Sequence, residues 1–322
     1  MVEEEVAQEG GAGREIDRMG ERPIGLVLSS GGARGAAHTG VLKVLEEHRI
    51  PIDIIVGTSM GAMVGGAYAA GVPAKRIEQE WLKTDLVRVA KSFMPTLSLR
   101  GWSSGNEVRR ILQEIVGDKR IEELPLKFAA IAADIETGEE VIIQEGPLVD
   151  AMRASSSIPG VFVPVKYRRQ FLVDGGLVNP LPVDVARRIG ADIVIAIDVG
   201  HYPRRPERRP GQSFTGRALR FIEERLGGLI PNGWAEPLKN LTNEEQEELR
   251  RGAPGVINVL LLSAVILQRR IVELNNKTSP PDVLIHPGLD EDPPRYHQVK
   301  HGIEAGEAAA REALAEIERL IG

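Results

Sequence analysis

The chain has 322 residues, enough for one large α/β domain or two small ones. Its 40 Lys and Arg and 46 Asp and Glu give a formal net charge of −6, so we expect no nucleic-acid partner. It contains no cysteine, which excludes a disulfide framework, a thiol nucleophile and cysteine-ligated metals and fits a reducing compartment. Because no cluster of metal ligands is visible either, the sequence predicts neither a metal nor another cofactor.

The first 22 residues are acidic and contain glycines without a continuous apolar stretch. A signal peptide needs a basic start and an apolar centre, so we predict a disordered acidic tail over 1–22 and a cytoplasmic protein. One domain is expected to follow over 23–322. An uncharged run, 54–74, has the length of a membrane span, but its five glycines and Pro73 favour a buried strand, a turn and a helix.

Strand and helix signals alternate from residue 24 onward, which predicts parallel βαβ units. A buried strand at Ile24–Leu28 precedes helical spacing at Thr39–Arg49, and a second strand at Ile52–Val56 precedes a helix at Met60–Ala70. Further helices are expected over 73–91 and, behind a Ser-Ser-Gly-Asn capping signal, over Glu107–Val116.

The second half of the chain predicts hairpins, then strands separated by a helical excursion. Turn signals place hairpins between Phe128–Ala133 and Glu140–Gln144 and between Val163–Tyr167 and Phe171–Val173. The remaining expected elements are strands at Ile193–Asp198 and Val283–Ile285, an Arg-rich loop at 201–217 that opens a largely helical excursion over about 201–276, and a closing helix at Arg295–Leu320.

The second strand runs into Gly57-Thr58-Ser59-Met60-Gly61, a G-x-S-x-G pattern followed by a helix. Flanking glycines permit a strained turn that holds the serine hydroxyl at the strand end, and the start of the next helix favours negative charge there. We therefore take Ser59 as the candidate nucleophile. The alternative is a glycine-rich turn between packed elements.

A second glycine turn lies one βα unit earlier, where Ser30 precedes Gly31, Gly32, Ala33, Arg34 and Gly35. Its N–H groups can converge on an anion in a dinucleotide site, a phosphate site or an oxyanion hole. The dinucleotide fingerprint needs glycine where Ser30 stands, and the loop lacks the Gly-Lys-Ser/Thr of a Walker loop. Because adjacent parallel strands bring both turns to one sheet edge, an oxyanion loop is favoured.

The third motif is Phe171-Leu-Val-Asp174-Gly175-Gly176, a hairpin strand that ends in an acid and two glycines. By itself Asp-Gly-Gly is an ordinary turn. Its meaning changes only in the company of a nucleophile turn and an anion-binding loop, which makes Asp174 a candidate base.

The three motifs, in this order, resemble those of the patatin-like phospholipase family, especially its small bacterial single-domain members. The resemblance runs from about Pro23 to Val199 and includes the segments that begin Ala36-Ala-His-Thr-Gly, Arg153-Ala-Ser-Ser-Ser and Asn179-Pro-Leu-Pro. It implies a three-layer α/β/α sandwich with a central, mostly parallel sheet, and a lipid or small acyl-ester substrate.

The resemblance also implies the roles of single residues. Ser59 would be the nucleophile, Asp174 its general base without a histidine, and Gly31–Gly35 the oxyanion loop. In this reading Asp174 takes the Ser59 proton as the hydroxyl attacks an ester, and water then hydrolyses the acyl-serine. The sequence departs from the family where Ser30 replaces a first glycine and Ala33 follows the pair, although neither change removes an N–H group.

Two alternatives stay open. A Ser-Asp-His triad of the α/β-hydrolase type would use Ser59, Asp174 and one late histidine, from among His286, His297 and His301. The nucleophile turn follows the second strand, however, which is too early for that fold. From another class, the chain would be a catalytically silent lipid-binding or regulatory protein.

Six arginines crowd one stretch of this acidic chain: Arg204, Arg205, Arg208, Arg209, Arg217 and Arg220. They suggest peripheral contact with anionic membrane headgroups, with a solvated linker as the alternative. The sequence indicates no headgroup, acyl-chain length, regiospecificity or oligomeric state.

Overall fold

The computed structural model describes residues 22–83, 103–200, 256–289 and 299–322. The chain divides into two units, one formed by 1–202 with 268–322 and the other by 203–267. The predicted tail (apart from Arg22), the Arg-rich loop and its arginine cluster lie outside the described residues. So does the expected helical excursion up to residue 255.

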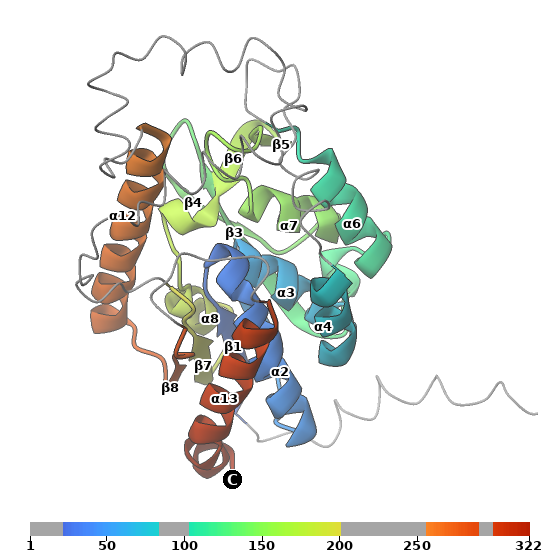
Figure 1. The fold of residues 1–322 in the computed structure, drawn as a ribbon, viewed down its shortest axis with the longest axis vertical. Helices are drawn as coiled ribbons and strands as arrows, with labels where there is room; N and C mark the ends of the chain where they lie inside the picture. Colours follow the sequence, from blue (N-terminus) through green and yellow to red (C-terminus); the bar gives the residue numbers. More distant parts are fainter. Residues whose placement is uncertain (1–21, 84–102, 201–255, 290–298) are drawn as a thin grey trace, which may run out of the picture. The chain divides into compact units, whose positions relative to one another are not determined.

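One sheet organises the first unit (Figure 1). Its hydrogen-bonded path runs β5-β6-β3-β2-β1-β7-β8, and β4 pairs with β3. The five strands β3, β2, β1, β7 and β8 are mutually parallel, and the two hairpins add antiparallel strands. The strands are β1 (Ile24–Leu28), β2 (Ile54–Thr58), β3 (Lys127–Asp134), β4 (Glu140–Ile143), β5 (Val165–Tyr167), β6 (Gln170–Asp174), β7 (Ile193–Ile197) and β8 (Val283–Ile285).

Helices cover both faces of this sheet. The longer ones are α2 (Ala36–Glu47), α3 (Met60–Ala69), α4 (Ala74–Lys83), α6 (Asn106–Val116), α7 (Leu148–Ser155), α8 (Val183–Arg188), α12 (Val256–Thr278) and α13 (Val299–Ile321). The described ranges also contain the short 3₁₀ turns η1 (Gly32–Gly35), η2 (Ile121–Glu123) and η3 (Gly175–Leu177).

The parallel strands are apolar on both faces because each face packs against helices. Side chains alternate along β1, so that Leu26 and Leu28 lie in the larger cluster with α2, α3, α7 and α13, while Val27 lies in the second. The second cluster contains Val183 of α8 and Val272 of α12. The architecture is therefore the three-layer α/β/α sandwich that the family resemblance implies.

Most predicted elements are confirmed, with shifted ends. The second strand lies two residues later than predicted, at Ile54–Thr58, and therefore reaches the nucleophile turn directly. The helix after residue 105 begins behind Gly105 in a left-handed conformation, without the expected side-chain cap. The sequence patterns do not predict α7 or α8. Both are short, at eight and six residues, and follow prolines rather than polar caps.

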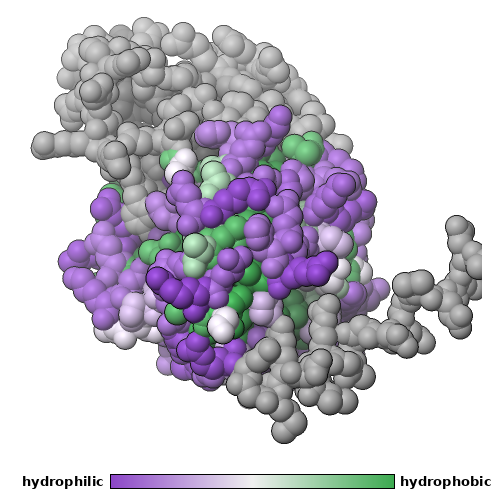
Figure 2. Space-filling model, turned by 90° about the horizontal axis from the view of Figure 1, so that it is seen from below, coloured by the Kyte–Doolittle hydropathy of each residue, from purple (hydrophilic) through white to green (hydrophobic). Residues whose placement is uncertain are grey.

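The uncharged run 54–74 folds into β2 and α3, as predicted. No helix in the described part of the chain is both long and apolar enough to cross a membrane. Viewed from below, the described surface is mainly hydrophilic, with hydrophobic residues between the hydrophilic ones (Figure 2).

Candidate active site

Strand β3 brings Ser59, the candidate nucleophile, and Asp174 together. Thr58, the last residue of β2, pairs with Ile131, and the next β3 residue, Ala132, pairs with Asp174 at the end of β6. Because β4 pairs with the same β3 residues along the opposite edge, β2 and β6 share one edge. β2 is parallel to β3 and β6 antiparallel, so the two strands run toward each other and stop one β3 position apart.

The Ser59 turn has a strained backbone. Ser59 has φ 56° and ψ −118°, values that a side-chain-bearing residue adopts only when its surroundings enforce them. Two glycines supply the space for this turn. A Cβ added at Gly61 would lie 2.2 Å from the Leu28 carbonyl oxygen, and one added at Gly57 would lie 2.4 Å from the Gly61 carbonyl oxygen. The predicted sharp strand-to-helix turn is therefore present.

Two side-chain hydroxyl groups support the Ser59 turn through hydrogen bonds. The Ser59 backbone N–H donates to Ser155 Oγ at 2.9 Å, and Ser155 Oγ donates to the Ile131 carbonyl at 2.5 Å. Thr58 Oγ1 donates to the Asn179 carbonyl at 2.8 Å. Sequence analysis assigned Ser155 no role, although it lies in the Arg153-Ala-Ser-Ser-Ser segment that carries the family resemblance.

Asp174 faces the serine hydroxyl. Ser59 Oγ donates to Asp174 Oδ2 at 2.6 Å, and the Gly176 N–H donates to Oδ1 at 2.8 Å. The Asp174 N–H is fixed by the Ser157 carbonyl at 2.9 Å. Both dyad side chains are buried, and burial raises the pKa of Asp174 to about 6, against the two hydrogen bonds that lower it.

The glycine loop after β1 lies beside this pair. Gly31 caps η1, Gly32 has φ +56°, and η1 continues through Ala33, Arg34 and Gly35. A Cβ added at Gly35 would lie 2.1 Å from Met60 Cγ, which places the loop against the residue that follows the nucleophile. The first N–H groups of a helical turn lack an acceptor within it, so η1 offers donors for an anion.

His38 follows this loop but serves packing. It is buried, its Nε2 contacts the Ser29 carbonyl at 2.9 Å, and burial lowers its pKa to about 4. Among the described residues, no histidine is hydrogen-bonded to Ser59 or Asp174. The geometry therefore favours the two-residue arrangement over the triad. Of the triad candidates, His297 lies outside the described residues.

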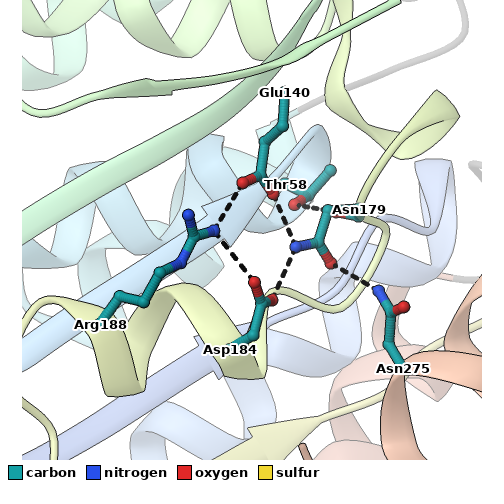
Figure 3. Close-up of polar contacts among 6 residues, drawn as sticks. All are labelled: Thr58, Glu140, Asn179, Asp184, Arg188 and Asn275. Atoms are coloured by element: carbon teal, nitrogen blue, oxygen red, sulfur yellow. Dashed lines mark hydrogen bonds and ion pairs between the residues drawn. The ribbon is translucent and has the colours of Figure 1, made fainter. Parts of the chain in front are cut away.

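A polar cluster supports the nucleophile turn through Asn179 (Figure 3). Besides accepting from Thr58, Asn179 donates through Nδ2 to Glu140 at 2.7 Å and to Asp184 at 2.8 Å. Arg188 bridges the same two carboxylates at 2.6 and 3.0 Å. The cluster ties the end of β2 to β4 and α8, and sequence analysis noted only its Asn179-Pro-Leu-Pro segment.

The described residues contain no group of three or more metal-ligating side chains. What the fold and site define is an α/β protein with a buried serine-aspartate pair at the carboxyl end of a parallel strand. The family model of the patatin-like phospholipases matches residues 26–187. The chain therefore belongs to the patatin-like phospholipase family, as the sequence motifs predict.

Similar proteins come from bacteria and mammals. An uncharacterized NTE family protein of Mycobacterium tuberculosis is 38% identical over 199 residues, 61% of this chain and 54% of that protein. Another, from Mycobacterium bovis, is 36% identical over 318 residues, 96% of this chain and 49% of that protein. Human patatin-like phospholipase domain-containing protein 6 is 36% identical over 221 residues, which are 67% of this chain and 16% of that protein. The chain thus spans about half the length of these bacterial relatives.

Proposed function

We propose that this chain hydrolyses carboxylic esters of lipids, with Ser59 as nucleophile and Asp174 as general base. The observation that carries the proposal is the 2.6 Å hydrogen bond from Ser59 Oγ to Asp174 Oδ2 inside a strained strand-to-helix turn. Membership of the patatin-like phospholipase family supports a lipid as the acyl donor.

The reaction would take place in two steps. Asp174 accepts the Ser59 proton as Oγ attacks the ester carbonyl carbon, and the alcohol leaves with a proton returned from Asp174. Water then attacks the acyl-serine and gives a proton to Asp174, which returns it to Ser59 Oγ as the fatty acid leaves. A carboxylate with its pKa raised to about 6 is a stronger base than an exposed one, because burial disfavours its charged form.

The oxyanion formed in each step would be held by the loop Gly31–Gly35. Its η1 turn presents backbone donors beside Met60, and α3 begins directly after Ser59 with the positive end of its dipole toward the reacting centre. Where the loop departs from a run of three glycines, the Ser30 N–H donates to the Pro180 carbonyl at 2.9 Å, so the proposed oxyanion donors come from the residues after Ser30, and Ala33 keeps its N–H group.

A substrate panel tests the proposal. Purified wild type and Ser59→Ala are compared on p-nitrophenyl esters of increasing chain length and on phospholipid vesicles. We expect hydrolysis by the wild type that is lost in Ser59→Ala. A folded wild type that neither hydrolyses these esters nor reacts with a fluorophosphonate would instead favour the silent lipid-binding alternative.

Peripheral membrane contact through the arginine cluster at 204–220 and a cytoplasmic location stay predictions. Sedimentation with anionic vesicles tests the first, using a variant with the six arginines changed to Gln. Weaker binding by that variant is expected at low salt, and equal binding would contradict the hypothesis.

A further inference from the structure

Helix α12 carries a polar stripe toward the sheet. Gln268 and Asn275 are seven residues apart, with Val272 between them, so the three share one helical face. Val272 is buried in the core cluster that covers the second face of the sheet. Packing at Val272 therefore fixes the helix so that both polar side chains face the turns at the carboxyl ends of the strands.

Gln268 lies between the oxyanion loop and the base. Its Oε1 accepts a hydrogen bond from Ser30 Oγ at 3.4 Å. A Cβ added at Gly176 would lie 2.6 Å from Gln268 Nε2 and 3.0 Å from Asp174 Oδ1. The carboxamide thus contacts the residue that precedes the glycine loop and the turn that follows Asp174.

Asn275 is linked through Asn179 to the Ser59 turn. Its Nδ2 donates to Asn179 Oδ1 at 3.4 Å, and the Asn179 carbonyl accepts from Thr58, next to the nucleophile (Figure 3). One helix face therefore contacts the surroundings of all three motifs. Neither residue belongs to a motif, and both lie outside the segment 26–187 that the family model matches.

The sheet itself does not directly fix the distance between the glycine loop and the Asp174 turn. β1, which leads into the glycine loop, pairs with β2 and β7, whereas β6, which ends at Asp174, pairs with β3 and β5. Strand pairing therefore does not set the spacing of these two turns directly. Oxyanion donors act only when they point at the position where charge develops, and a misplacement of about 1 Å costs on the order of 100-fold in rate.

We infer that Gln268 is a positioning residue that holds the oxyanion loop and the Asp174 turn at their working distance. This inference rests on the proposed function. Gln268→Ala removes the carboxamide from between the two turns, so acylation of Ser59 slows by about 10-fold while binding of the substrate changes little. Gln268→Glu keeps the shape but adds a negative charge near Asp174, which disfavours a second carboxylate and moves the acid limb of the pH–rate profile upward.

The first test measures the second-order rate of fluorophosphonate labelling from pH 4.5 to 8.5, together with kcat and KM. Arg270→Gln is the control, because Arg270 lies on the same helix with 66% of its side chain exposed and pairs with Glu273. We expect the control to match the wild type, Gln268→Ala to lose kcat, and Gln268→Glu to shift the acid limb. A wild-type kcat for Gln268→Ala and an unmoved limb for Gln268→Glu would overturn the inference.

Ser30→Ala provides a double-mutant cycle. If Gln268 acts through its contact with the loop, the double variant labels about as slowly as the slower single variant. If the two substitutions instead reduce the labelling rate independently, so that their fold-losses multiply in the double variant, Gln268 does not act through Ser30.

A second test does not need catalysis. Hydrogen exchange followed by mass spectrometry compares peptides that cover 29–35 and 174–180 in the wild type, Gln268→Ala and Arg270→Gln. Faster exchange in both peptides of Gln268→Ala alone supports the positioning role, and unchanged exchange contradicts it. Were the wild type not labelled at all, the proposed function would fail, while this comparison would still decide whether Gln268 holds the two turns.

Discussion

The two turns that meet on one edge of β3 are built in different ways. At Ser59 the backbone is strained, with φ 56°, and glycines in close contact with carbonyl groups leave the turn no room to relax. At Asp174 the backbone is ordinary, with φ −52°, and what is unusual is the burial of a carboxylate. Ser59 is thus positioned by backbone geometry, whereas the pKa of Asp174 is set by its surroundings.

The largest expected effects come from deleting either reactive group. Ser59→Ala should reduce kcat by about 10⁴-fold or more, and Asp174→Asn by about 10³- to 10⁴-fold, because the remaining oxyanion donors act without a competent nucleophile. Steady-state hydrolysis of a soluble p-nitrophenyl ester measures both. A hydrolysis rate close to that of the wild type in either variant would show that the chemistry takes place elsewhere.

Next in size is the steric test of the nucleophile turn. Gly61→Ala would bring a Cβ within 2.2 Å of the Leu28 carbonyl oxygen, so the backbone must shift, and we expect a loss of about 3 kcal/mol in the free energy of unfolding. Urea denaturation measures it. Gly288→Ala is the matched control, since nothing lies within 4 Å of that Cβ. Equal stability of the two variants would mean that the turn is not closely packed.

The base turn is tested by pH. The pKa of Asp174 is raised to about 6, so the folded state holds this proton more tightly than the unfolded state does. Relative to Asp174→Asn, the wild type is therefore most stable below about pH 4 and loses about 3 kcal/mol of that advantage as the pH rises through 6. Denaturation of both proteins from pH 4 to 8 measures the difference. A difference that does not change with pH would contradict the raised pKa.

The smallest expected effect concerns the support behind the serine. Thr58→Val keeps the shape of the side chain but removes the donor to the Asn179 carbonyl, which is left buried with one partner fewer. We expect a loss of about 1 kcal/mol in stability and a few-fold decrease in kcat. A kcat above that of the wild type would show that this hydrogen bond does not support the turn.

Sequence reasoning located both turns but could not show that they meet. Gly57 and Gly61 around Ser59 signal a local turn, and Asp174 is recognisable only as the end of a hairpin. That β6 continues the edge of β3 where β2 ends depends on two long-range pairings, of Thr58 with Ile131 and of Ala132 with Asp174, and no local pattern encodes them. Only the family resemblance linked Ser59 to Asp174 before the fold was known.

The supporting residues were harder still to predict. The Ser155 hydroxyl joins the Ser59 N–H to the Ile131 carbonyl, and the Asn179 backbone carbonyl accepts from Thr58 Oγ1. Such contacts depend on orientation rather than on sequence spacing. Gln268 lies on a helix whose sequence resembles any amphipathic core helix, and its neighbours Ser30 and Gly176 are 238 and 92 residues away. Short helices such as α8 carry too few turns for an apolar period to stand out.

The most direct test of the Ser59–Asp174 pair is the pH dependence of fluorophosphonate labelling, with the modified residue identified by mass spectrometry. The label should be found on Ser59, its rate should rise through about pH 6 and level off above, and Asp174→Asn should lose this rise along with most of the rate. Labelling at another residue, or an Asp174→Asn variant that reacts with the wild-type rate and pH profile, would contradict the account.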